Sequence, residues 1–138
     1  MSDRPLIAPN KNKPIIGPSG SGAIVSGDMS SNINGPVSII QRLPGISYDI
    51  VWTGTPTGTF TVQVSNSYFT DPEGNVIGTP NWTNLPTASF TGTYPVPSGS
   101  SGAGFLDVVG TEAYAVRLIY TSSSGSGSLT VYAAAKVL

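Results

Sequence analysis

The chain has 138 residues, of which six are basic and seven acidic, and it contains neither cysteine nor histidine. Only 9% of its residues are charged, against about 25% in ordinary domains. The missing residue types exclude disulfides, thiolate catalysis, and the commonest general base and transition-metal ligand. A net charge of −1 without a basic stripe gives no electrostatic footprint for nucleic acid, and we expect no cofactor.

Residues 1–22 contain proline and glycine at short intervals, which disfavours a helix and most sheet pairing. Two apolar pairs lie within this segment, Leu6-Ile7 and Ile15-Ile16. One interpretation is a disordered tail. The other is an extended N-terminal arm that lies on a neighbouring subunit, with these four residues as its contacts.

The first residues lack the apolar core of a signal peptide. No apolar run approaches the roughly 18 residues that a membrane-spanning helix needs. We therefore expect a protein made in the host cytoplasm, without a signal peptide and without a membrane partner.

Residues 23–138 are expected to form one β-sandwich domain of about seven to nine strands. The composition favours short strands joined by turns, and no segment has a clear helical pattern. Besides the two strands discussed next, strands are predicted at 23–25, 36–43, 81–85, 89–94, 105–109, 114–121 and 129–134.

Residues 46–53 and 59–65 show the clearest alternation of apolar and polar side chains, which is the pattern of a half-buried strand. Ile46 and every second residue up to Trp52 share one face. Residues 54–58 supply the glycine and proline of a tight turn. We therefore predict that the two strands form a hairpin.

Turn signals at roughly 8–12-residue intervals indicate a sandwich, a jelly roll or a small barrel. We predict an all-β fold, a single antiparallel β-sandwich or jelly roll. The large aromatic residues predicted to fill much of its core are Tyr48, Trp52, Phe60, Trp82, Phe105, Tyr114 and Tyr120.

Residues 68–80 are predicted to form a loop around a turn sequence that begins at Asp71. Oxygen-bearing side chains at alternate positions superficially resemble a calcium loop, but the full twelve-residue pattern is absent, which favours a plain turn. This loop is the candidate recognition surface, with Tyr68, Phe69, Asp71, Glu73 and Asn75 as its residues.

An enzymatic alternative rests on Asp49 and Asp107, which both lie in predicted strands. A glycosidase needs two carboxylates facing each other across a cleft. We favour the simpler explanation that these residues face solvent or pair with Arg42 or Arg117, and we expect a non-enzymatic protein.

Three stretches together resemble the small β-sandwich structural proteins of bacterial viruses, found on heads, tails and fibres: 52–67 (WTGTPTGTFTVQVSNS), 81–86 (NWTNLP) and 105–132. The resemblance implies a virion location without catalytic residues. It also implies a capsid decoration or cement protein, with a tail or fibre component as the next choice. The implied partners are a major capsid or tail protein and copies of the chain itself.

A second resemblance is to discoidin-type jelly rolls, carried by residues 60–66, 81–82 and 114–120. Ser67-Tyr68 stands where that family usually has Asp-Gly, and the loop before Trp82 is longer. This resemblance implies the alternative function, a carbohydrate-binding module that recognises a host or surface glycan through exposed aromatic residues such as Tyr68 and Trp82.

Overall fold

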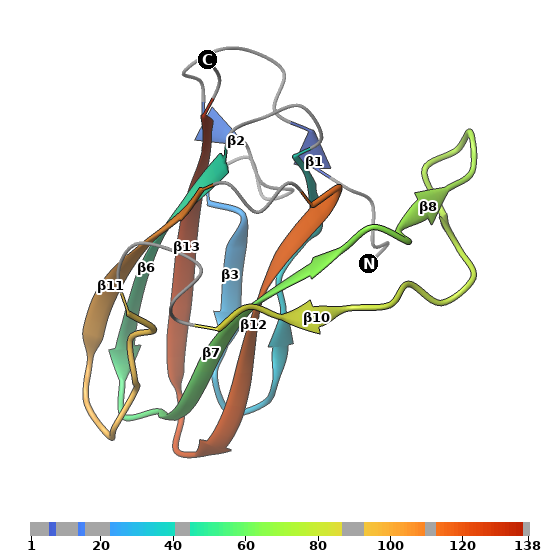
Figure 1. Cartoon of the computed structure of the whole chain (residues 1–138). Coiled ribbons are helices and arrows are strands. Elements are labelled where there is room, and N and C mark those ends of the chain that lie inside the picture. The colour runs from blue at the N-terminus through green and yellow to red at the C-terminus, as the bar shows by residue number, and fades with distance from the viewer. Residues whose placement is uncertain are drawn as a thin grey trace.

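The computed structural model describes residues 6–7, 14–15, 23–40, 45–86, 93–109 and 113–136. These residues form strands, turns and loops, and none of them belongs to a helix that could cross a membrane. Two larger sheets lie face to face, and a small two-stranded sheet extends to one side (Figure 1). The predicted all-β sandwich is confirmed.

The first sheet, sheet A, is built around two long antiparallel strands. Its order is β1 (Leu6–Ile7), β5 (Ser38–Ile39), β12 (Ala115–Ser124), β7 (Thr57–Ser65) and β10 (Thr83–Asn84), and β4 (Ile33–Asn34) also pairs with β12. Every pair is antiparallel except β1 with β5, which is parallel.

The second sheet, sheet B, is antiparallel throughout. Its order is β11 (Gly102–Val109), β6 (Gly45–Gly54), β13 (Gly127–Lys136) and β2 (Pro14–Ile15), and β3 (Val25–Asp28) also pairs with β13. The small third sheet pairs β8 (Phe69–Thr70) with β9 (Val76–Ile77).

The core lies between the inner faces of sheets A and B, and alternate residues of the long strands supply it. The predicted inward set of β6, from Ile46 to Trp52, is buried, as the period of two requires. The inward residues of the facing and neighbouring strands complete the cluster: Phe60, Val62, Leu106, Val108, Val116, Leu118, Tyr120, Leu129, Val131, Ala133 and Ala135.

The predicted hairpin of β6 with β7 is wrong. β6 pairs with β11 and β13, whereas β7 pairs with β12 and β10. The connection at Thr55-Pro56 carries the chain from one sheet to the other, so Trp52 and Phe60 face each other across the core with ring centroids 5.7 Å apart. Alternation predicts which residues share a face, but a buried face is compatible with pairing in either sheet.

The other aromatic residues predicted for the core lie in three different environments. Tyr48 and Tyr120 are buried in the core, while Trp82 and Tyr114 are half-buried in a second cluster on the outer face of sheet A. Phe105 was wrongly assigned to the core, because it is 58% exposed. Its neighbours Leu106 and Val108 occupy the inward positions of β11, so the period of two turns Phe105 outward.

The short predicted strands also differ in extent. Within 36–40 only β5 is a strand, and residues 41–43 lie outside the described residues. The segment 81–85 is reduced to β10. Of the strand predicted at 89–94, residues 93–94 are not in a strand, and the remainder lies outside the described residues.

Two connections between the sheets meet at one end of the sandwich. The turn from β12 to β13 also crosses between the sheets, and the Thr55 N–H donates to the Ser126 carbonyl at 2.9 Å. Gly125, in this turn, has a φ of 76°. A Cβ added to Gly125 would lie only 2.1 Å from the Thr55 carbonyl oxygen.

Replacing Gly125 with Ala is therefore expected to destabilise the fold by about 3 kcal/mol, since it combines a left-handed backbone with a clash against rigid backbone. Gly78→Ala is the matched control, because Gly78 has a φ of 69° and nothing within 4 Å of the added Cβ. Chemical denaturation of both variants should show a loss of only about 1 kcal/mol for Gly78→Ala. Equal losses of stability in the two variants would contradict the close packing of Gly125 against Thr55.

Two tyrosines differ in how the structure satisfies their hydroxyl groups. Tyr48 is fully buried, and its Oη has no hydrogen-bond partner among the described residues. Burial raises the pKa of the Tyr48 phenol well above its ordinary 10.0. Tyr94 Oη instead accepts the Val62 N–H at 2.9 Å and donates to the Leu85 carbonyl at 2.7 Å.

Removing each hydroxyl should consequently shift stability in opposite directions. Tyr48→Phe is expected to stabilise by about 1 kcal/mol, because it removes an unsatisfied polar group. Tyr94→Phe is expected to destabilise by about 1–2 kcal/mol, because it leaves the Val62 N–H without its acceptor. Urea denaturation at neutral pH compares the two variants, and a loss of stability in Tyr48→Phe would contradict the isolated hydroxyl.

The raised pKa of Tyr48 should also make the stability of the fold depend on pH in alkaline solution. Above about pH 10 the unfolded chain releases the Tyr48 proton while the folded chain retains it. The wild-type stability should therefore fall as the pH rises beyond 10, and the fall should be less steep in Tyr48→Phe.

Candidate functional site

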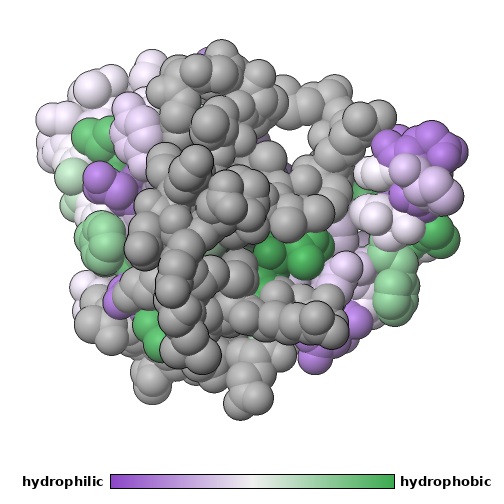
Figure 2. All heavy atoms as spheres, turned by 90° about the horizontal axis from the view of Figure 1, so that it is seen from above, coloured by the Kyte–Doolittle hydropathy of each residue, from purple (hydrophilic) through white to green (hydrophobic). Residues whose placement is uncertain are grey.

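The candidate recognition loop forms a small hairpin that projects from sheet A. Phe69 pairs with Ile77, and Thr70 with Val76. Figure 1 shows this hairpin reaching away from the two packed sheets, and in Figure 2 it stands at the right edge, where hydrophilic and hydrophobic residues lie next to each other. The hairpin therefore extends beyond the two packed sheets.

The tip of the hairpin is held by Asp71. Its Oδ1 accepts the backbone N–H of Glu73 at 3.0 Å and of Asn75 at 2.8 Å. The Asp71 N–H donates to the Asn75 carbonyl, and Gly74 closes the turn with a φ of 87°. The Asn75 N–H is the chief cause that lowers the pKa of Asp71 below its usual 3.8. Asp71 is thus occupied by its own turn, as a plain turn requires, and no described residues form a metal-binding cluster.

The two strands of the hairpin present an apolar pair to solvent. Phe69 is 61% exposed and Ile77 is 53% exposed, and they lie directly opposite each other. Directly opposed side chains in an antiparallel pair have Cβ atoms about 5 Å apart, so the two form one continuous apolar surface. Sequence reasoning missed Ile77, although its position across the turn from Phe69 was a usable signal.

The base of the hairpin is packed against the outer face of sheet A. Tyr68 is only 2% exposed and contacts the ring of Trp82, with centroids 5.9 Å apart. The Arg117 guanidinium lies over the Trp82 ring at 4.2 Å. Arg117 Nε also donates to Gln63 Oε1 at 2.9 Å, and Gln63 Nε2 donates to Asn84 Oδ1 at 2.9 Å. This row joins three strands and anchors the hairpin.

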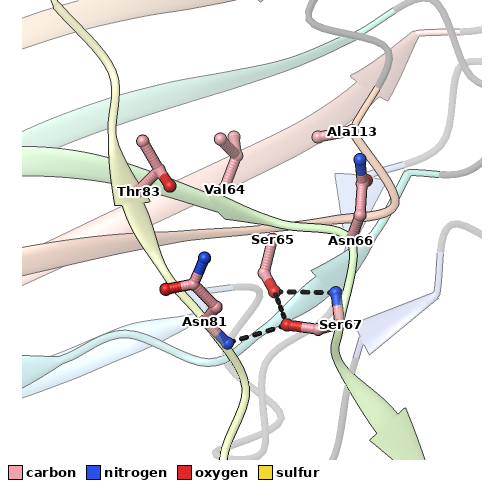
Figure 3. A pocket seen from close by; sticks show the side chains of 7 residues that line it. All are labelled: Val64, Ser65, Asn66, Ser67, Asn81, Thr83 and Ala113. Carbon is pink, nitrogen blue, oxygen red and sulfur yellow. Dashed lines mark hydrogen bonds between the residues drawn. The ribbon is translucent and has the colours of Figure 1, made fainter.

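A shallow pocket of about 450 Å³ lies beside this base and is lined by Val64, Ser65, Asn66, Ser67, Asn81, Thr83 and Ala113 (Figure 3). The hydroxyl groups of Ser65 and Ser67 already have partners. Ser65 Oγ accepts the Ser67 N–H at 3.1 Å, and Ser67 Oγ accepts the Asn81 N–H at 2.8 Å. Since none of the lining side chains is charged, the pocket serves mainly to tie the two ends of the hairpin segment together.

The structure places the predicted recognition residues unequally. Phe69, Glu73 and Asn75 are exposed, Asp71 is half-buried in the turn, and Tyr68 belongs to the buried base. Trp82 is half-buried beneath Arg117. Tyr68 and Trp82 therefore do not form the open aromatic surface that the carbohydrate-binding alternative expects. A recognition role for the loop stays a prediction.

The predicted arm residues are described only in part. Leu6 and Ile7 form β1, which pairs with β5, and Ile15 lies in β2, which pairs with β13. Ile16 lies outside the described residues. Whether the arm contacts another subunit stays a prediction, as does the division at residue 22.

The two carboxylates of the enzymatic alternative lie on the outer face of sheet B. Asp49 is opposite Phe105, and Asp107 is two residues further along β11, which places the pair diagonally about 7–8 Å apart. Asp49 is exposed on the open sheet face. Neither the pocket at Ser65 nor a shallow pocket at Ser26 includes either carboxylate.

No model of a protein family matches the chain, and no curated protein matches it. One similar solved structure is the enzymatically active domain of tailspike protein 4 of bacteriophage CBA120, with a TM-score of 0.38 and 18% identity over 75% of this chain. Another is the K1 cleaved adhesin domain of Lys-gingipain from Porphyromonas gingivalis, with a TM-score of 0.38 and 11% identity over 80% of this chain. The chain spans 14% of the tailspike chain and 73% of the adhesin chain.

The carboxylate at the tip should make the order of the hairpin depend on pH. Because the folded pKa of Asp71 is lowered, its contribution is present above the ordinary pKa near 4 and is lost as the pH falls through the lower folded value. The hydrogen-exchange protection factors of residues 69–77, which correct for the intrinsic exchange rate at each pH, should therefore fall in acid in the wild type. Asp71→Asn should remove this pH dependence, while Glu73→Gln should retain it. An unchanged profile in Asp71→Asn would contradict the role of Asp71.

Proposed function

We propose that this chain is a non-enzymatic structural protein of a bacterial virus that works by contact with other virion subunits. The observation that carries the proposal is the exposed apolar pair of Phe69 and Ile77 on an anchored, projecting hairpin. The resemblance of residues 52–67, 81–86 and 105–132 to small virion β-sandwich proteins supports the class of particle. Within that class the proposed role is a capsid decoration or cement protein, with a tail or fibre component as the alternative.

The energetics favour repeated weak contacts over one strong contact. Full burial of a large apolar side chain contributes about 1.5–3 kcal/mol. Because Phe69 is 61% and Ile77 53% exposed, burying the exposed parts of both supplies about 2–3 kcal/mol. Association itself costs about 4–15 kcal/mol in lost freedom. One hairpin is therefore insufficient, and stable binding requires further contacts or several linked copies on one particle. The proposed arm, with Leu6, Ile7, Ile15 and Ile16, provides a second contact.

Two variants test the hairpin contact. We expect the double variant Phe69→Ser with Ile77→Ser to fold normally, since both side chains are solvent-exposed, but to be depleted at least about tenfold from purified virus particles, because an apolar contact of this size is worth more than 1.4 kcal/mol. Val96→Ser is the matched control, because Val96 is 62% exposed in a different loop. Quantitative mass spectrometry of gradient-purified particles measures the incorporation of each protein.

Absence of the wild-type chain from particles would contradict the virion assignment itself. Equal incorporation of the wild type and the double variant would contradict the hairpin contact alone. Deletion of residues 1–22 tests the arm separately, and we expect a folded protein that no longer joins the particle.

A further inference from the structure

The outer face of sheet B carries an arrangement that the proposed hairpin contact does not use. In the backbone register, Asp49 of β6 lies between Phe105 of β11 and Tyr132 of β13. Neighbouring strands are about 4.8 Å apart, so the two aromatic residues start about 10 Å apart with the carboxylate between them. We call these three residues the aromatic–acidic row.

The aromatic–acidic row is exposed to solvent, and apolar side chains lie beside it on the same sheet face. Phe105 is 58% exposed, Tyr132 is 44% exposed, and Asp49 is also exposed. Val51 and Val109 on the same face are 40% and 45% exposed. Figure 2 shows hydrophobic and hydrophilic residues side by side on the flank that carries β11 in Figure 1. A gathering of exposed large apolar side chains on one sheet face indicates an interaction surface.

The charge on this face restricts what can cover it. Asp49 has no hydrogen bond or ion pair within the described part of the chain. Its two register partners, Phe105 and Tyr132, are uncharged, and Asp107 on the same face adds a second carboxylate. A purely apolar partner would bury an uncompensated carboxylate, which is costly. A second copy placed face to face would bring its own Asp49 towards this one and add like-charge repulsion. The partner must therefore supply a positive charge.

We propose that the aromatic–acidic row binds an arginine side chain presented by a partner protein. A planar guanidinium group donates two parallel hydrogen bonds to a carboxylate and stacks on aromatic faces. The chain has a related arrangement on the opposite sheet, where the Arg117 guanidinium lies over the Trp82 ring at 4.2 Å and Arg117 Nε donates to Gln63 Oε1 on the neighbouring strand. On sheet B the aromatic rings and the acceptor are present, and the partner contributes the cation.

Arginine fits this row better than lysine. An ammonium group is a compact and strongly hydrated charge, whereas the guanidinium group loses less hydration and offers a flat surface to both rings. The proposal does not depend on the virion assignment, because the row would bind such a side chain in any assembly.

The test is a nuclear magnetic resonance titration of the full chain with capped Gly-Ser-Xaa-Ser-Gly peptides in which Xaa is arginine, lysine or citrulline. Citrulline is the neutral isostere of arginine. We expect the arginine peptide to shift the amide signals of Asp49, Phe105 and Tyr132 with a Kd near about 1 mM. The lysine peptide should bind several-fold more weakly, and the citrulline peptide should not saturate.

Three exposed substitutions and one control complete the test. Asp49→Asn should weaken arginine-peptide binding by at least about tenfold, and Phe105→Ala and Tyr132→Ala should each weaken it several-fold. Asp28→Asn removes an equal charge from the exposed end of β3 and should leave the affinity unchanged. Thermal denaturation confirms that each variant is folded.

Several results would overturn the proposal. These are no saturable shift with the arginine peptide, equal binding of the citrulline peptide, or wild-type affinity in Asp49→Asn. A concentration-dependent dimer in sedimentation velocity that Phe105→Ala abolishes would instead assign the face to a second copy. Shifts of the same amide signals by maltohexaose, without any by the arginine peptide, would assign it to a glycan.

Discussion

The contact of three aromatic rings across the core is the interaction on which the rest of the structure depends. Trp52 in sheet B faces Phe60 in sheet A, and Phe60 packs against Tyr120 with centroids 5.1 Å apart. The rings lie near the end where both crossovers pass between the sheets, so they set the spacing that Thr55 and Gly125 must bridge. The Trp52 indole N–H also donates to the Ser100 carbonyl at 2.9 Å, which ties the loop before β11 to the same end.

Because this core holds the sheets together, their outer faces are available for other tasks, and the two faces differ. On sheet A, the cluster around Tyr68 and Trp82 covers the strands and supports the projecting hairpin. On sheet B, the aromatic–acidic row stays exposed. A subunit with two unlike contact surfaces on opposite sheets suits heterologous association, in which each surface meets a different partner or site.

The candidate site illustrates where residue types alone mislead. The turn at Asp71 was predictable, since Asp, Gly and Asn in sequence favour a closed turn. The burial of Tyr68 was not, because it depends on a contact with Trp82, fourteen residues along the chain. Tyr68 is buried only because the hairpin folds back over sheet A. Phe105 is exposed because Leu106 and Val108 are in phase with the core, a signal that the alternation of β11 already contained.

The sequence by itself determined that the chain is all-β, which residues of the long strands face the core, and where most turns occur. Those features follow from local rules: the period of two, the backbone preferences of glycine and proline, and the shortage of helix-favouring charged residues. Only the tertiary structure decided that β6 and β7 belong to different sheets. It also decided that Arg117 reaches Trp82 and that Asp49 lies between Phe105 and Tyr132. Strand partners and cross-strand neighbours arise from contacts between segments far apart in the chain, and one strand's pattern carries no information about them.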